Sequence, residues 1–139
     1  MNEIVFVNGC FDAPLHVGHL NLLKFAAGYG PVHVAINSDT SIRRLKGPAR
    51  PIVPENQRRE MLLAIRYVTS VFIFQGDDPL AELEARTPSI LIVGPDHSLD
   101  SKMCEYVRSY GGKVIRYYGP KHLGTSELIR RIASCQPAS

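Results

Sequence analysis

Short apolar runs alternate along the chain with longer segments whose apolar residues recur at helical spacing. The short runs are continuously apolar, which is typical of parallel strands that are buried on both faces. We expect strands at residues 4–7, 32–36, 71–74, 90–93 and 114–118. We expect helices at residues 15–27, 39–45, 55–67, 79–86, 101–110 and 125–134, separated by loops that contain Gly and Pro.

This alternation predicts an α/β fold, a single doubly wound Rossmann-like domain with a five-stranded parallel sheet. A chain of 139 residues is long enough for one compact domain. We assign residues 1–135 to the domain and expect residues 136–139 to form a flexible tail. In such sheets ligands bind beyond the carboxyl ends of the strands, so candidate chemistry is sought in the loops that follow them.

Composition narrows the classes of function. Hydrophobic residues make up 45% and charged residues 21%, as in an average soluble protein, and no apolar run reaches the length of a membrane span. Cys10, Cys104 and Cys135 form no C-x-x-C pair, and the N-terminus lacks the features of a secretory signal. These observations predict a cytoplasmic protein without a membrane partner.

The positive charge is concentrated in one stretch of the chain. Arg43, Arg44, Lys46 and Arg50 lie close together, and Arg58 and Arg59 follow. The cluster is either a solvated basic surface or a pocket for phosphate groups, which Arg and Lys bind by charge-assisted hydrogen bonds. The net charge is only +3 and no aromatic residues are interleaved with the cluster, so we expect no nucleic-acid partner.

The loop after the first predicted strand places two histidines at the start of a helix. His16 and His19 are three residues apart, which puts both imidazoles on one helical face. A helix N-terminus favours anions, so neutral imidazoles there can donate N–H groups to phosphate oxygens. Gly9 and Gly18 allow a ligand to approach the backbone closely. A metal-binding pair and ordinary capping histidines are the alternatives.

A second candidate phosphate site precedes the last predicted helix. Thr125 and Ser126 can present hydroxyl and N–H groups to a phosphate at that helix N-terminus. Simple N-capping by the Thr125 side chain is the alternative explanation. Lys121 and Arg130 are additional candidates for phosphate contacts.

Two sets of residues resemble known families. Gly9, Phe11 and Asp12, followed after three residues by His16, Gly18 and His19, resemble the G-x-F-D and H-x-G-H signature of the nucleotidyltransferase superfamily in its cytidylyltransferase-like branch. Residues 37–51 and 58–71 resemble the heptose-1-phosphate adenylyltransferases of ADP-heptose synthesis. The chain departs from the pattern of that subgroup at residues 93–97 and 124–126, where substrate and base would be held.

The resemblance implies a mechanism and a set of roles. A substrate phosphate attacks the α-phosphorus of a nucleoside triphosphate and pyrophosphate leaves, with Mg²⁺ bound mainly through the triphosphate and no protein metal site assigned. The implied catalytic residues are His16, His19 and Lys46. The implied nucleotide-binding residues are Gly9, Cys10, Phe11, Asp12, Gly18, Thr125 and Ser126. The residues implied to contact substrate or base are Asp39, Arg43 and Asp96.

The implied partners are a nucleoside triphosphate and a phosphorylated sugar or polyol, in a protein expected to be a homodimer. We expect transfer of AMP from ATP to a sugar phosphate such as heptose 1-phosphate. A cytidylyltransferase acting on glycerol 3-phosphate or another small polyol phosphate is one alternative. A non-catalytic nucleotide-binding module is an alternative from another class, against which the intact histidine pair and Lys46 argue.

Overall fold

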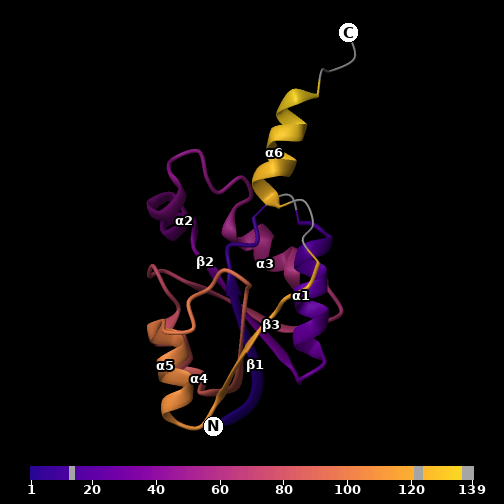
Figure 1. Cartoon of the computed structure of the whole chain (residues 1–139). Helices are drawn as coiled ribbons and strands as arrows, with labels where there is room; N and C mark the ends of the chain where they lie inside the picture. Colours follow the sequence, from indigo (N-terminus) through magenta and orange to yellow (C-terminus); the bar gives the residue numbers. More distant parts are fainter. Residues whose placement is uncertain (13–14, 121–123, 136–139) are drawn as a thin grey trace.

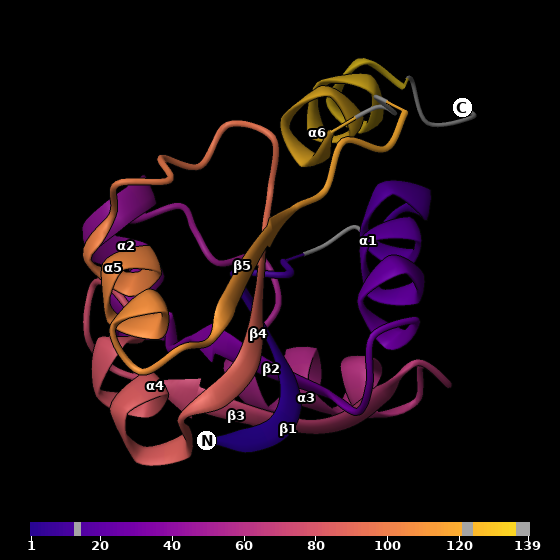
Figure 2. The same ribbon diagram turned by 60° about the horizontal axis from the view of Figure 1, so that its bottom comes forward.

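Five parallel strands form one sheet in the order β3-β2-β1-β4-β5. Figures 1 and 2 show the sheet from two directions. This computed structural model describes residues 1–12, 15–120 and 124–135, so the predicted tail at residues 136–139 lies outside the described residues. The fold class predicted from the sequence is confirmed. The strands are β1 (Asn2–Gly9), β2 (Val32–Asn37), β3 (Val68–Phe74), β4 (Pro88–Val93) and β5 (Lys113–Arg116).

Helices cover both faces of the sheet. One core cluster joins β1 and β2 to Leu23 and Ala26 of α1 and to Leu62 of α3. The other joins the opposite sheet face to Leu83 of α4 and to α5, and Figure 2 shows these two pairs of helices on opposite sides of the strands. The helices are α1 (Val17–Ala27), α2 (Asp39–Lys46), α3 (Glu55–Leu63), α4 (Leu80–Arg86), α5 (Lys102–Ser109) and α6 (Thr125–Ser134).

The central strand explains why the apolar runs are continuous. Val5 and Val7 of β1 belong to one core cluster, whereas Phe6 between them belongs to the other. Successive side chains of a strand point to opposite faces, and both faces here are covered, so each position must be apolar. The carboxyl end of β1 therefore lies between β2 and β4, at the centre of the edge where ligands bind.

The largest difference from the predicted elements lies between α3 and β3. The helix expected at residues 55–67 ends at Leu63, and the strand expected at residues 71–74 begins at Val68. Val68 pairs with Val32, and the strand continues in register along β2 after an irregularity. Sheet pairing of this β-branched and aromatic segment thus overrides the apolar spacing that suggested a longer helix.

The last helix differs from the others in its packing. Helix α6 contains no buried residue, whereas each of the other helices has at least one. Figure 1 shows α6 beyond the carboxyl ends of the strands, at the end of the molecule opposite the N-terminus. In the part of the chain that the structure describes, no helix is long and apolar enough to cross a membrane.

Candidate active site

His16 and His19 cap helix α1 together. The Nδ1 atom of His16, the N-cap residue, accepts the backbone N–H of Gly18 at 3.1 Å, and the Nδ1 atom of His19 accepts the backbone N–H of His16 at 3.2 Å. The ring centroids of the two histidines are 3.9 Å apart. Because Nδ1 is an acceptor in each ring, the proton of each neutral imidazole lies on Nε2, which is a hydrogen-bond donor.

The surroundings of His19 favour its neutral state. Burial, and then the charge of His16, lower the pKa of His19 from 6.5 to about 4. A neutral donor at a helix N-terminus is what the sequence predicted for binding phosphate oxygens. The two histidines therefore do cap the helix, as one of the alternatives proposed. The same capping bonds place the ring proton on Nε2, which is the tautomer that phosphate binding requires.

The loop that carries the histidines is anchored in the core. Phe11 is 6% exposed, its ring lies 5.2 Å from that of His19, and its φ of 47° is unusual for an aromatic residue. A Cβ atom on Gly9 would lie 2.9 Å from the Phe11 ring. Gly9 is thus explained by the packing of Phe11, and the close approach of a ligand proposed from the sequence is not needed to account for it.

Asp12 joins the histidine loop to the loop between α2 and α3. Its side chain is 1% exposed and its carboxylate accepts the Nε–H of Arg50 at 2.9 Å. The same carboxylate accepts the backbone N–H groups of Ile52 and Val53, both at 2.9 Å. A buried carboxylate engaged in this way acts on a nucleotide through the loop that it holds, so we assign Asp12 a positioning role.

Arg58 is buried at the centre of the same region. Its guanidinium donates to the carbonyl oxygens of Cys10, Asn37 and Val53 and forms an ion pair of 2.9 Å with Asp39. One side chain thereby connects the loop after β1, the end of β2 and the start of α2. The sequence placed Arg58 in a surface or phosphate-binding cluster, and its burial shows that this assignment was wrong.

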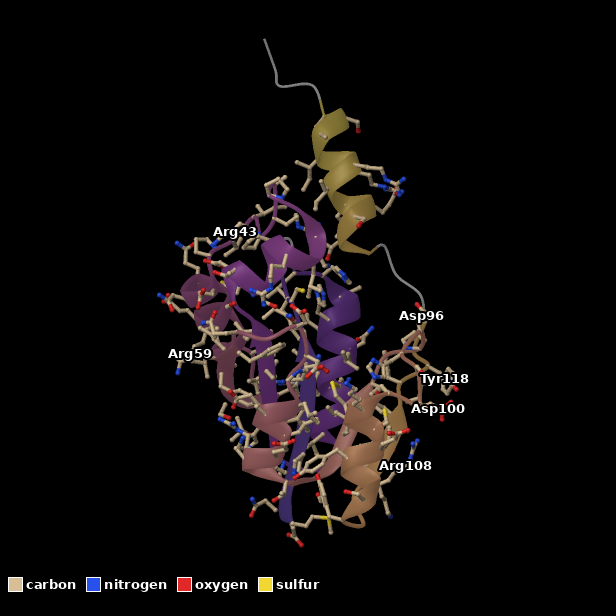
Figure 3. The ribbon with its side chains drawn as sticks, turned by 90° about the vertical axis from the view of Figure 1, so that its left-hand side faces the viewer. Arg43, Arg59, Asp96, Asp100, Arg108 and Tyr118 are labelled. Atoms are coloured by element: carbon tan, nitrogen blue, oxygen red, sulfur yellow. The ribbon has the colours of Figure 1, made fainter. Side chains whose placement is uncertain are left out.

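The rest of the basic cluster divides into engaged and exposed side chains. Arg44 donates to the carbonyl oxygen of Gln75 and pairs with Asp77, while Arg59 donates to the carbonyl oxygen of Val71. The side chains of Arg43 and Lys46, at the end of α2, are exposed, and Figure 3 shows Arg43 near the carboxyl edge of the sheet. Arg43 and Lys46 are therefore the members of this cluster best placed to receive a phosphate group.

The remaining predicted residues lie around this centre. The Sγ atom of half-buried Cys10 lies 3.6 Å from Oδ1 of Asn37, which agrees with a residue that lines the loop. Asp39 is bound to Arg58, and Asp96 is exposed in the segment that follows β4. The candidate Lys121 lies outside the described residues.

The start of α6 excludes one of the two explanations offered for Thr125. The N-cap residue is Gly124, and no side chain caps the helix. Thr125 is therefore the first helical residue, and simple N-capping by its hydroxyl is wrong. The N-terminal N–H groups of α6 have no capping side chain, and the exposed Ser126 hydroxyl lies beside them. This arrangement suits the oxygens of a phosphate group.

Sequence reasoning missed Arg58, although a signal was present. Arg58 precedes Leu62 by four residues, which places both on the same face of α3, and both are buried. A charged residue at an apolar position of a helix indicates a buried, fully paired group rather than a surface cation.

Comparisons with known proteins identify the family of the chain. A family model described as cytidylyltransferase-like matches residues 6–131. The bifunctional protein HldE of Koribacter versatilis is 49% identical over 131 residues, which are 93% of this chain and 27% of that protein. The bifunctional protein HldE of Geobacter sulfurreducens is 44% identical over 132 residues, which are 94% of this chain and 27% of that protein.

A solved structure supports the same assignment. The lipopolysaccharide core biosynthesis protein from Thermoplasma volcanium superposes with a TM-score of 0.72 and 25% sequence identity, covering 86% of this chain and 98% of that one. Fold, site and relatives together define a nucleotidyltransferase. The chain belongs to the cytidylyltransferase-like family, and it spans 27% of the length of the two HldE relatives.

Proposed function

We propose that the protein transfers AMP from ATP to a sugar phosphate such as heptose 1-phosphate and releases pyrophosphate. The observation that carries this proposal is the histidine pair, whose Nδ1 atoms are held by backbone N–H groups so that both Nε2 atoms are donors. The pair lies at the carboxyl end of β1, with the cations of α2 after the neighbouring strand β2. These donors and cations match the charge of a triphosphate and a phosphorylated acceptor.

The chemistry needs position and charge more than covalent help. An oxygen of the acceptor phosphate forms a bond to the α-phosphorus while the bond to the oxygen that bridges to the β-phosphate breaks, and pyrophosphate leaves with that electron pair. His16 and His19 donate hydrogen bonds to the α-phosphate oxygens as negative charge increases there. Lys46 and Arg43 bind phosphate oxygens, and the N-terminus of α6 binds the β- and γ-phosphates.

Magnesium fits this site as part of the nucleotide substrate. The carboxylates of Asp12 and Asp39 are engaged by Arg50 and Arg58, and the described residues include no group of three or more His, Cys, Asp or Glu side chains able to hold a metal ion. Mg²⁺ bound to the triphosphate would neutralise phosphate charge. Protein residues then contact the phosphates directly rather than through a metal cage.

The substrate choice rests on two lines of support. Residues 37–51 resemble heptose-1-phosphate adenylyltransferases, and the relatives include proteins named HldE and a lipopolysaccharide core biosynthesis protein. A cytidylyltransferase acting on glycerol 3-phosphate or another polyol phosphate is the second candidate. It is favoured by the departure from the subgroup pattern at residues 93–97, which follow β4 at the ligand edge.

We further propose that the protein works in the cytoplasm as a homodimer. Its three cysteines are free thiols, as is usual in a reducing compartment. A mostly apolar cleft, lined by Leu15, His16, Val17, Leu20, Met61 and Ile65, supports a contact between two copies beside the histidine pair. Sedimentation of the purified protein at several concentrations tests the dimer.

Pyrophosphate release across four nucleoside triphosphates tests the proposed reaction. Each nucleotide is paired with heptose 1-phosphate, hexose 1-phosphates and glycerol 3-phosphate, with Mg²⁺ present. We expect the fastest turnover with ATP and heptose 1-phosphate. Efficient turnover with CTP and glycerol 3-phosphate alone would establish the second candidate, and nucleotide binding without any turnover would indicate a non-catalytic module.

A further inference from the structure

Arg116 connects the segment after β4 to the segment after β5. It is the last residue of β5 and pairs in register with Val93, the last residue of β4. Its Nη2 atom donates to the carbonyl oxygen of His97 at 2.5 Å, and its Nη1 atom donates to the Tyr118 hydroxyl at 3.2 Å. Its guanidinium carbon lies 5.7 Å from the centroid of the Tyr118 ring. Arg116 thus holds two segments together at the carboxyl edge of the sheet.

The His97 side chain fixes the same segment at a second point. Its Nε2 atom lies 2.9 Å from Oγ of Ser101, the N-cap residue of α5, and that Oγ atom accepts the N–H of Cys104. Burial and the charge of Arg116 lower the pKa of His97, so its ring is neutral at pH 7. Residues 94–101 are therefore held by Arg116 on one side and by helix α5 on the other.

Carboxylates and cations are mixed on this side of the molecule, whereas α2 ends in the exposed cations Arg43 and Lys46. Figure 3 shows Asp96, Asp100, Arg108 and Tyr118 on one side of the molecule, opposite Arg43 and Arg59. The Arg108 guanidinium donates to the carbonyl oxygen of Leu99. Exposed carboxylates such as Asp96 can accept hydrogen bonds from ribose hydroxyls or from a base amine. Tyr118 is 73% exposed, and an exposed aromatic ring can stack on a nucleobase. The nucleoside of the donor therefore suits this side, and the phosphate groups of donor and acceptor suit the α2 side.

We propose that Arg116 is a positioning residue that holds residues 94–101 and Tyr118 as the wall that recognises the nucleoside of the donor nucleotide. This inference rests on the proposed function. The buried Nε atom of Arg116 has no hydrogen-bond acceptor among the described residues, and an unpaired buried donor is unfavourable for stability. Packing alone therefore does not account for an arginine at this position. Its two hydrogen bonds, to the His97 carbonyl oxygen and to the Tyr118 hydroxyl, do account for it.

The variant Arg116→Met removes both hydrogen bonds and keeps most of the side-chain volume. We expect the Kd for ATP, measured by calorimetry without acceptor, to rise about tenfold, as the loss of one strong interaction predicts. The KM for ATP should rise in parallel, the preference for ATP over CTP should narrow, and the KM for the acceptor should stay within about twofold. A purely structural role would instead raise both KM values and lower the melting temperature.

Arg66→Met is the matched control. Arg66 also donates to a tyrosine, at 3.0 Å to the Tyr67 hydroxyl, with its guanidinium carbon 5.0 Å from the ring centroid. It lies just before β3, at the amino end of that strand and away from the ligand edge. We expect its nucleotide affinity to equal that of the wild type, so a matching loss in this control would overturn the specific role of Arg116.

Arg116→Lys keeps the inference testable if Arg116→Met does not fold. Lysine can donate to the His97 carbonyl oxygen but lacks the planar fork that reaches two acceptors, so we expect an intermediate Kd for ATP. A wild-type Kd in a folded Arg116 variant would overturn this inference alone, because wild-type turnover would still support the proposed function. Absence of ATP binding and turnover in the wild type would overturn the proposed function itself.

Discussion

The loop between β1 and α1 and the N-terminus of α6 are both assigned to phosphate groups, yet they are held very differently. In the loop, Phe11 and Asp12 are 6% and 3% exposed, and the buried Arg58 guanidinium donates to the Cys10 carbonyl oxygen. Helix α6 has no buried residue and no side-chain cap, and Ile132 is 61% exposed. One phosphate site is thus built into the core and the other stands outside it.

This difference indicates that the two phosphate sites have different roles. Donors that stabilise a transition state act best when they are already in place, because no energy is then spent on ordering them during the reaction. Segments with few buried contacts open at low free-energy cost, as binding elements that move must do. We therefore expect Phe11, Asp12 and the two histidines to be in place before nucleotide binds, and α6 to become ordered by the triphosphate.

Loss of Arg58 should destabilise the region around the loop after β1. In Arg58→Met the carboxylate of Asp39 loses its partner, and three carbonyl oxygens lose a donor. Removing one partner of a buried ion pair costs about 3–5 kcal/mol, so we expect the free energy of unfolding to fall by that amount in urea titrations. Arg59→Met on the same helix, where the side chain is exposed, is the control and should cost less than about 1 kcal/mol. Equal losses in the two variants would contradict the connecting role of Arg58.

Loss of either histidine should abolish most of the chemistry while leaving the fold. Removing one preorganised donor costs about 10²–10³-fold in turnover, and we expect this for His16→Ala and His19→Ala. Helix capping is lost as well, at a cost of about 1 kcal/mol, which a melting curve measures separately. His33→Ala, whose imidazole bonds to Ser70 within the sheet, should keep its turnover. A loss of less than threefold in both site variants would refute the catalytic assignment.

The pH dependence of stability offers a second measure of the loop. The pKa of His19 is 6.5 in a free side chain and about 4 in the folded protein. Between these values the unfolded chain binds a proton that the folded chain does not, so this contribution is intact above pH 6.5 and is lost as the pH falls towards 4. The loss amounts to no more than about 3.5 kcal/mol. Urea titrations of the wild type and of His19→Gln between pH 7 and pH 4 isolate the contribution of His19, because the other groups are common to both proteins. If the free energies of unfolding of the two proteins fall in parallel over this range, the lowered pKa of His19 is contradicted.

The sequence predicted the fold well because the two sheet faces impose a strong pattern. A strand such as β1, buried on both faces, must be apolar at each position, and the helices that cover it show their spacing directly. The boundary between α3 and β3 was wrong because pairing of Val68 with Val32 is a contact between distant residues. Local spacing carries no information about such a contact.

The candidate site was predictable only in part, for a similar reason. His16 and His19 are near in sequence, and their spacing alone puts them on one face of a helix. By contrast, Asp12 meets Val53, and Arg116 meets His97, across gaps of 41 and 19 residues. Whether a charged residue binds a ligand or holds a loop depends on these contacts, which is why Arg58 was included in a cluster interpreted as a solvated surface or a phosphate pocket.

The exposed and engaged cations of the basic cluster should give different kinetic effects. Lys46→Ala removes an exposed charge at the end of α2, and we expect the nucleotide KM to rise or turnover to fall by about tenfold, the loss of one charge-assisted hydrogen bond. Arg50→Ala removes the ion pair with Asp12, which still accepts two backbone N–H groups, so we expect a smaller kinetic effect. Steady-state kinetics at fixed ionic strength decide the order. If the nucleotide KM and the turnover of Lys46→Ala equal those of the wild type, the basic cluster is only a solvated surface.

The smallest expected effect concerns the exposed phosphate site. Ser126→Ala removes one hydroxyl at the start of α6, so we expect the KM for nucleotide to rise about threefold and the unfolding free energy to change by less than about 0.5 kcal/mol. Arg130 and Arg131 are exposed on this helix and are trypsin sites, so ordering of α6 by ATP should slow cleavage there. The protection should be weaker in Ser126→Ala than in the control Ser134→Ala at the other end of the helix. Equal rates of cleavage with and without saturating ATP would show that ATP does not order α6. That result would contradict the proposed difference between the two phosphate sites.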